Sequence, residues 1–365
     1  MNTKLPLSVL AFAKNEEDRL QGYKNFKEYY DMYKNNKSVD ANGVTFEEKN
    51  DIMLNFYKDE IERLSKMKIS DTEDLKVYCG FTAVKEAAFA IMGMLTDLVM
   101  PDALIKDLSA IAEFKNGGWG DTLKIDLKPR DLFVISKGGR ARRTYDITRQ
   151  YNGEKTIVPE VHGITVGISL YDVLRGAYTL AEFVSKAALS LEVNIRYDIY
   201  DAFAAAMNAL PTTAGAAQLH LTGFSQDAAI SLAQKVEAWN YGNKAVFLGT
   251  KLALSKILPA STNVRILLGD EYVKVGYIRE FFGFSAVEME QVADYTTEFG
   301  LKLDDEKIYI VSPGTDKIVK VFFEGSTLSN VEGNYANADL ENTATLYKSY
   351  GVAVATSAIA GVIDL

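Results

Sequence analysis

Few residues of this chain have the types and spacing that chemistry at a protein site requires. His162 and His220 are the only histidines, Cys79 is the only cysteine, and no Cys-x-x-Cys motif exists. A metal centre built from clustered His and Cys ligands is therefore not expected. A single cysteine also allows no intramolecular disulfide, which fits folding in a reducing compartment. We expect His162, beside a glycine at the start of a predicted strand, to be a turn or interface residue.

The short motifs that resemble catalytic signatures are each incomplete. Gly117–Gly120 reads GGWG and lacks the Lys-Ser/Thr of a phosphate-binding loop, and no Gly-x-Gly-x-x-Gly follows a strand. Gly223–Asp227 has half of a nucleophile elbow without its closing glycine, so Ser225 is expected to be a helix N-cap. The acidic run Asp304–Glu306 could hold a cation, although a surface turn is favoured. We predict no catalytic residue, no cofactor and no metal site, and thus no enzyme.

The composition is that of an ordinary soluble globular protein. With 365 residues, the chain is expected to have two or three lobes of about 150 residues each. A net charge of −9 argues against a protein that coats nucleic acid through a basic face. The apolar run near Met1 is too short for a secretory signal. The most apolar later window, Phe81–Met100, contains Lys85, Glu86 and Asp97, which makes it a poor membrane span.

The longest predicted element is a helix from Thr179 to Leu210. It contains no proline or glycine, Thr179 and Glu182 have the spacing of a capping box, and Pro211 marks its end. About 30 residues give a rod of about 45 Å. Its apolar residues recur at steps of three and four and form one stripe. The stripe consists of Leu174, Ala177, Ala181, Val184, Ala188, Leu191, Ile195, Ile199 and Phe203.

The segments before this helix are predicted to be helical and then extended. Residues 1–75 are charged, and a capping box at Thr45 opens a helix to Lys68 whose sparse apolar residues suggest packing on another subunit or lobe. Residues 79–114 have apolar helical patterns that we expect to break at Pro101. Three methionines here are expected to fill the core: Met92, Met94 and Met100.

From Gly117 the hydrophobic period changes to two, which predicts strands. The strands are expected at 123–127, 132–135 and 164–170, with turn-rich basic segments between them. A ribbon of about 50 residues has too little apolar surface to fold alone, so we expect an arm that reaches onto a partner. A solvated loop, a nucleic-acid patch and an acidic protein partner remain open for its basic residues. The candidates for inter-subunit contacts are Lys137, Arg140, Arg142, Arg143, Arg149 and Lys155.

The segments after Pro211 alternate between helix and strand. Helices are predicted at 225–239 and 251–257, and strands at 244–248, 264–268, 286–290, 308–311 and 318–323, which makes 225–323 a mixed α/β lobe. The last apolar stretch, 345–363, is read as a buried pair of strands. We expect the long helix to pack on a sheet that includes 352–363, and not on a second long helix.

The order of these parts resembles the tailed-phage major capsid proteins of the Hong Kong 97 type, over about Gly117 to Leu365. The segments that carry the resemblance are AVFLGTKLALSKI (245–257), IREFFGFSAVEME (278–290), EKIYIVSPGTDKIVKVFFEG (306–325) and YGVAVATSAIAGVI (350–363). The resemblance implies an α+β, Hong Kong 97-like capsid fold. Its parts would be an N-terminal helical arm (1–116), an extended β-ribbon loop (117–170), a spine helix with peripheral domain (171–223), an axial domain (224–323) and C-terminal strands of the peripheral domain (324–365).

The function that this resemblance implies is that of a structural major head protein. Such a protein self-assembles into hexamers and pentamers of an icosahedral shell around double-stranded DNA. The implied partners are other copies of the chain, portal and scaffolding or maturation proteins, and packaged DNA contacted non-specifically, with no membrane. The implied location is the virion, assembled in the host cytoplasm. The family's lysine–asparagine crosslink cannot be placed at Lys155 or Asn152, and residues 1–75 are expected to be a retained arm.

Two other functions stay open. An encapsulin-type nanocompartment shell shares the fold, although the long charged N-terminal region argues against it. An α/β enzyme would have its site at the carboxyl ends of the strands in the 225–323 lobe. That interpretation rests on Val246–Gly249 alone.

Overall fold

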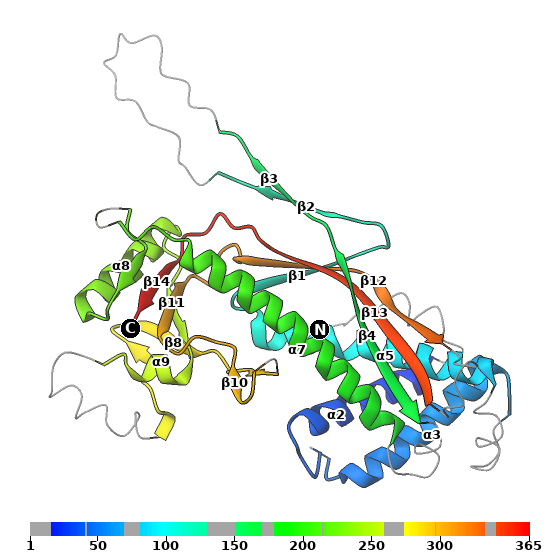
Figure 1. Ribbon diagram of the computed structural model, residues 1–365. Helices are drawn as coiled ribbons and strands as arrows, with labels where there is room; N and C mark the ends of the chain where they lie inside the picture. Colours follow the sequence, from blue (N-terminus) through cyan, green and yellow to red (C-terminus); the bar gives the residue numbers. More distant parts are fainter. Residues whose placement is uncertain are drawn as a thin grey trace.

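The computed structural model describes residues 16–40, 42–68, 81–129, 150–169, 179–213, 215, 217–258, 274–295, 297–332 and 341–365. One long helix, α7 (Leu180–Asn208), crosses the molecule (Figure 1). A helical region lies at one end of α7 and a smaller α/β region at the other, while a narrow ribbon of two strands projects from the body.

Helix α7 forms where its caps and its apolar period predict it. Thr179 Oγ1 accepts a hydrogen bond from the Glu182 backbone N–H at 3.3 Å, and the helix ends one residue before the C-cap Ala209. The described part of the predicted stripe is at most 2% exposed. Its residues are Ala181, Val184, Ala188, Leu191, Ile195, Ile199 and Phe203. The predicted spine-length helix is confirmed, because both its ends and its buried face agree with the sequence pattern.

The N-terminal helices form a core of their own with α7. Helices α2 (Glu16–Lys34) and α3 (Phe46–Ser65) pack on each other and on α5 (Thr82–Leu108). The capping box predicted at Thr45 is confirmed. The expectation that α3 packs on another subunit or lobe is wrong, since Met53, Tyr57 and Ile61 are buried in this core. Three buried residues suffice because their spacing of four places them on one face of the helix, and the large tyrosine ring fills much of the contact.

Helix α5 is continuous through Pro101, so the break expected there is wrong. Proline in a helix interior costs about 3 kcal/mol, but apolar residues on both sides of it are fully buried, among them Met92, Met100 and Leu104. Tertiary packing therefore offsets the lost hydrogen bond. Among the described residues α5 is the one helix long and apolar enough to cross a membrane. However, 56% of its most apolar window is buried inside the protein, as in a core helix.

Helix α7 packs on α5 as well as on sheets, which corrects the expectation that it avoids a second long helix. The sequence pattern suggested only the sheet because α5 was expected to be interrupted. Helix α5 also ends earlier than the predicted 114, at Leu108, and residues 112–117 form a strand. The buried residues of α7 therefore pack with residues of α5 as well as with residues of both sheets.

The first sheet has four strands in the order β1-β12-β13-β4. Its strands are β1 (Ala112–Gly117), β12 (Val319–Glu332), β13 (Glu341–Val354) and β4 (Glu160–Ser169). The strand expected at 318–323 in the α/β lobe lies in this sheet instead, paired with β1 and β13. Val319, Val321 and Phe323 alternate toward the α7 core. Alternation gives the buried face of a strand but not its partners.

The second sheet has six strands in the order β5-β14-β11-β6-β8-β7. These are β5 (His220–Thr222), β14 (Gly361–Asp364), β11 (Lys307–Val311), β6 (Val246–Gly249), β8 (Phe284–Glu288) and β7 (Glu280–Phe281). Helices α8 (Gln226–Trp239) and α9 (Lys251–Ser255) pack on it, close to their predicted bounds. The strand pair expected at 345–363 is wrong, because β13 and β14 belong to different sheets. The strand predicted at 264–268 lies outside the described residues.

The projecting ribbon consists of β2 (Leu123–Leu127) and β3 (Gly153–Ile157), paired antiparallel (Figure 1). Its base is fixed because Ile125 and Ile157 pack on Phe322 and Ala355. The strand predicted at 123–127 is confirmed. The strand predicted at 164–170 exists as β4, but it leaves the ribbon and pairs with β13. The strand predicted at 132–135 lies outside the described residues.

Candidate inter-subunit surfaces

His162, His220 and Asp305 each contact side chains of the fold. The His162 ring stacks on the Tyr350 ring at a centroid distance of 4.0 Å, and His220 Nε2 lies 2.7 Å from Asp364 Oδ2 at the end of β14. Asp305 accepts hydrogen bonds from Thr250 Oγ1 at 2.5 Å and Gln291 Nε2 at 3.3 Å. In the described part of the chain, no group of three or more His, Cys, Asp or Glu residues is placed to hold a metal ion.

Ser225 occupies the N-cap position of α8, as predicted, but its side chain makes no capping hydrogen bond. The glycine-rich turn at 118–121 follows β1 directly, and the Gly118 backbone N–H donates to Asp121 Oδ2 at 2.7 Å. Each of these short motifs therefore has a place in a turn or a helix end.

A buried carboxylate fastens the arm helix α2 to α7. Glu192 is 0% exposed and accepts hydrogen bonds from Tyr30 Oη (2.6 Å), Lys34 Nζ (2.7 Å) and Arg196 (2.6 Å). Arg196 also pairs with Asp107 of α5. Burial and the nearby Glu192 charge raise the pKa of Tyr30 well above its usual value, which keeps its hydroxyl a donor. Because Glu192 takes its donors from α2 and α7, and Arg196 also pairs with Asp107 of α5, the three helices are held in one arrangement.

A second buried carboxylate joins α5 to the four-stranded sheet. Asp97 accepts hydrogen bonds from the Thr327 backbone N–H, from Thr327 Oγ1 and from Lys348 Nζ, each at 2.6 Å. Thr327 lies in the β12 irregularity between Glu324 and Leu328, where a backbone N–H is free to turn toward the helix. No sequence signal pointed to this junction, since the three residues come from three separate segments.

The ribbon carries exposed charges. Lys155 is exposed on β3, opposite Ile125 in register, and Lys124 Nζ lies 3.0 Å from Glu154 Oε1. Of the six predicted contact residues, only Lys155 is among the described residues. The other five lie outside them: Lys137, Arg140, Arg142, Arg143 and Arg149. The exposure of Lys155 on a projecting ribbon is compatible with a contact to another chain.

An acidic hollow lies where β4 and β13 meet α7, at the base of the ribbon. This hollow of about 310 Å³ is lined by Glu160, His162, Asp198, Asp201 and Tyr350, among others, with no lysine or arginine in the lining. Tyr350 Oη donates a hydrogen bond to Asp198 at 2.5 Å, and burial, with this bond, raises the pKa of the Tyr350 hydroxyl well above its usual value. The hollow combines three carboxylates from a strand and a helix, which is why the sequence did not reveal it.

The hairpin formed by β9 (Ala293–Asp294) and β10 (Gly300–Leu301) presents apolar side chains to solvent. Phe299 is 97% exposed and has a positive φ of 54°, and Tyr295 and Leu301 are also well exposed. The hairpin is held on α7, because Tyr197 Oη donates to the Ala293 carbonyl and accepts from the Tyr295 backbone N–H. Exposed apolar groups on a fixed support are typical of an interaction surface.

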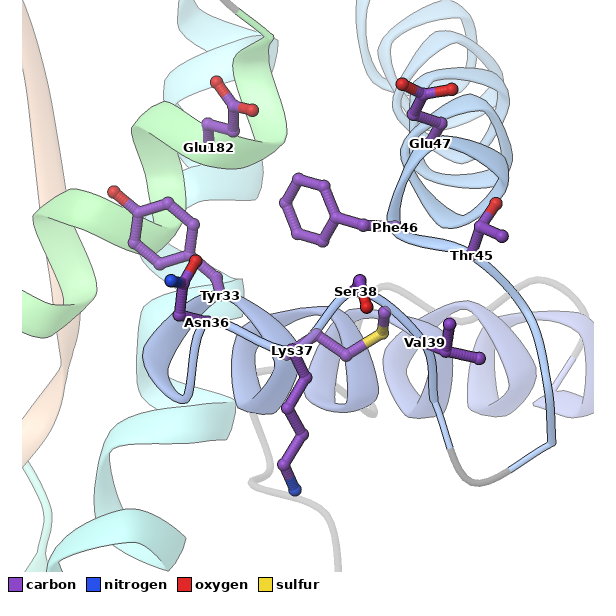
Figure 2. A pocket seen from close by; sticks show the side chains of 10 residues that line it. Tyr33, Asn36, Lys37, Ser38, Val39, Thr45, Phe46, Glu47 and Glu182 are labelled. Carbon is purple, nitrogen blue, oxygen red and sulfur yellow. The ribbon is translucent and has the colours of Figure 1, made fainter.

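A pocket of about 610 Å³, which we call the arm pocket, opens between the end of α2, the start of α3 and the start of α7 (Figure 2). Its lining consists of Met32, Tyr33, Asn36, Lys37, Ser38, Val39, Thr45, Phe46, Glu47 and Glu182. In Figure 2 the Phe46 ring points into the space between α2 and α7, and Lys37 extends away from Glu47 and Glu182. The size is that of a binding pocket for a small molecule or a few side chains.

A long central helix, a projecting ribbon and two sheets define the class of protein: a mixed α+β, Hong Kong 97-like fold. The capsid structure of the cyanophage P-SCSP1u has this fold, with a TM-score of 0.50 over 71% of this chain and 87% of that chain at 11% identity. The mature capsid of bacteriophage PhiM1 (TM-score 0.48, 11% identity, 70% and 86% covered) is also similar. So is the capsid of a native GTA particle (TM-score 0.48, 12% identity, 71% and 89% covered).

The particular family follows from the sequence itself. The family described as SPbeta prophage-derived putative capsid protein YonB matches residues 34–364, and the chain belongs to this family. A search of curated proteins found no match. The chain is thus a capsid protein, a structural component of the virion and not an enzyme. The resemblance drawn from the sequence is confirmed.

Proposed function

We propose that this chain is the major head protein of a tailed phage or prophage, and that copies of it form the hexamers and pentamers of an icosahedral shell around double-stranded DNA. The observation that carries the proposal is the family match over residues 34–364, since it covers nearly every described element. Rings of six and five require heterologous contacts, in which one surface of a subunit meets a different surface of the next. The ribbon, the exposed hairpin and the two hollows described above are surfaces of that kind.

The parts of the subunit take the roles that the fold suggests. Residues 1–116 act as a helical arm, 117–170 as the extended loop, and α7 as the spine of a peripheral domain that also contains 324–365. The axial domain extends from 224 to about 317, because β12, which begins at Val319, pairs with the strands of the peripheral sheet. Fastening of the arm by Glu192 supports an arm that stays on the mature subunit.

The basic residues of the extended loop set the register between neighbours. Residues 137–149 contain five basic side chains and one acidic one, and they would face acidic surfaces such as the hollow at Glu160 and Asp201. Exposed ion pairs contribute roughly 0–1 kcal/mol each, so they select an orientation more than they add strength. A subunit with a net charge of −9 would leave packaged DNA loosely held. Portal and scaffolding or maturation proteins complete the set of partners, and assembly takes place in the host cytoplasm.

Electron microscopy of the protein expressed alone tests the proposal. Closed shells, rings or tubes with six-fold units are the expected result, and a dispersed monomer at concentrations of tens of micromolar would overturn it. The contents of particles purified from the natural source separate the two shell functions. Nuclease-protected double-stranded DNA is expected for a head protein, whereas enclosed enzymes would identify a nanocompartment.

A further inference from the structure

Strand β4 leaves one long edge of the four-stranded sheet open. It is the last strand in the order β1-β12-β13-β4, and it pairs with β13 from Glu160 to Ser169 without a register shift. Among the described residues, no backbone hydrogen bond reaches the other side of β4. The free N–H and C=O groups of an edge strand are a template on which a further strand can pair.

The usual protections of an edge strand are missing from β4. Native sheets prevent edge pairing by short edge strands, bulges, proline or lysine. The edge strands β5 and β7 of the second sheet have three and two residues, and β1, at the opposite edge of the first sheet, carries Lys115. Strand β4 has ten residues, a regular register, and no proline, lysine or arginine. A long, regular edge of this kind is suited to pairing with another chain.

A second copy of β4 is the strand that fits this edge. A closed shell contains two-fold axes as well as rings, and a two-fold contact brings the same surface of both subunits together. Two identical edge strands meet antiparallel at an axis perpendicular to the sheet. In that arrangement the two Glu160 carboxylates lie at opposite ends of the pair, whereas parallel pairing would place these like charges side by side, which is destabilising.

The solvent face of β4 is complementary to itself about Ile164. Val161, Gly163, Thr165 and Gly167 are exposed, whereas Ile164 packs with the α7 core on the other face. With Ile164 on the axis, Val161 lies opposite Gly167 of the second copy, and Thr165 lies opposite Gly163. Each larger side chain then meets a glycine. An axis at Thr165 would instead set Gly163 opposite Gly167, where no side chains could make contact.

We propose that the β4 strands of two copies pair antiparallel across a two-fold axis at Ile164, so that the sheets of two subunits from neighbouring rings become one continuous sheet. This inference rests on the proposed function, because it requires a shell. It adds a contact between rings to the heterologous contacts within each ring.

Covalent capture tests the pairing in full-length chains in which Cys79→Ser removes the native thiol. Chains with Val161→Cys and chains with Gly167→Cys are mixed, assembled and oxidised. A disulfide-linked dimer on a non-reducing gel is expected, because the Cβ atoms of opposite residues lie about 4.5–5.5 Å apart. Each variant alone is the matched control. Six positions along a strand are about 20 Å, so neither variant by itself should give a dimer.

Each outcome of the capture experiment is decisive. Shells from the mixture without the linked dimer would overturn the inference and leave the proposed function intact, whereas a wild-type chain that forms no shell would overturn the proposed function itself. A dimer from Val161→Cys alone would indicate parallel pairing and would also contradict the inference.

The yield of closed shells is a second measurement. Thr165→Lys places a cation from each copy beside the axis, and we expect about ten-fold fewer shells while rings persist. Thr345→Lys is the control, since Thr345 lies opposite Thr165 on β13 and their Oγ1 atoms are 3.0 Å apart. It removes the same hydrogen bond one strand inside the sheet, and shells should persist. An unchanged yield from Thr165→Lys, or equal losses from both variants, would contradict the pairing.

Discussion

Replacing Glu192 by glutamine tests whether buried charge fastens the helical arm to the spine helix. The substitution keeps the shape of the side chain and one acceptor but removes the negative charge from a fully buried position. Arg196 keeps its partner Asp107, while Lys34 retains only a longer contact to Asp107, at 3.5 Å. Breaking a buried ion pair costs about 3–5 kcal/mol. Because the Lys34 side chain is 26% exposed and solvent screens its share, we expect the lower end, about 3 kcal/mol.

Hydrogen exchange of the α2 backbone amides measures this loss directly. At about 1.4 kcal/mol per factor of ten, a loss of 3 kcal/mol makes α2 open, and therefore exchange, about a hundred-fold faster. Asp59→Asn is the control, since Asp59 is exposed on α3 and surface substitutions change stability by less than about 0.5 kcal/mol. If Glu192→Gln left exchange in α2 within about two-fold of the unmodified protein, the argument that this carboxylate holds the arm would be refuted.

Three further predictions concern the spine helix and two groups of titrating residues. Ala188→Pro, at a fully buried position in α7, should cost about 3 kcal/mol or more and abolish shells in electron micrographs; normal particles would contradict the role of the helix. Lys320 lowers the pKa of Glu113, so this carboxylate stabilises the fold above its ordinary pKa of about 4.3, and the stabilisation disappears as the pH falls through the lowered value. Glu113→Gln should therefore lower the denaturation midpoint at pH 7 but not at pH 2, and equal losses at both would count against it. Burial raises the pKa values of Tyr200 and Tyr309 to about 12, so stability should be full below about pH 10 and fall between about pH 10 and 12. Tyr309→Phe should weaken that fall in alkaline denaturation followed by tyrosinate absorbance, and an unchanged profile would show that Tyr309 is not responsible.

The sequence by itself determined the local elements whose signals lie within a few residues of one another. The caps at Thr45 and Thr179, and the apolar stripe of α7, depend on contacts between residues three or four positions apart. The ribbon strand at 123–127 was equally readable from its period of two. The order of these elements was enough to indicate the capsid family.

Only the tertiary structure decided which elements meet. Strand β12 was expected in the α/β lobe but pairs in the four-stranded sheet, and β13 and β14 lie in different sheets. Alternation of apolar and polar residues specifies which face of a strand is buried, but it does not specify the strand with which it pairs. Pro101 stayed inside α5 since buried neighbours on both sides outweigh one lost hydrogen bond.

The surfaces proposed for assembly could not be predicted from the sequence, because each of them is formed by elements whose contacts only the tertiary structure decides. The arm pocket joins residues of α2, α3 and α7, and the acidic hollow joins β4, α7 and β13. Residues so far apart along the chain share no periodic pattern, and only the packing of the long helix against its neighbours places them side by side.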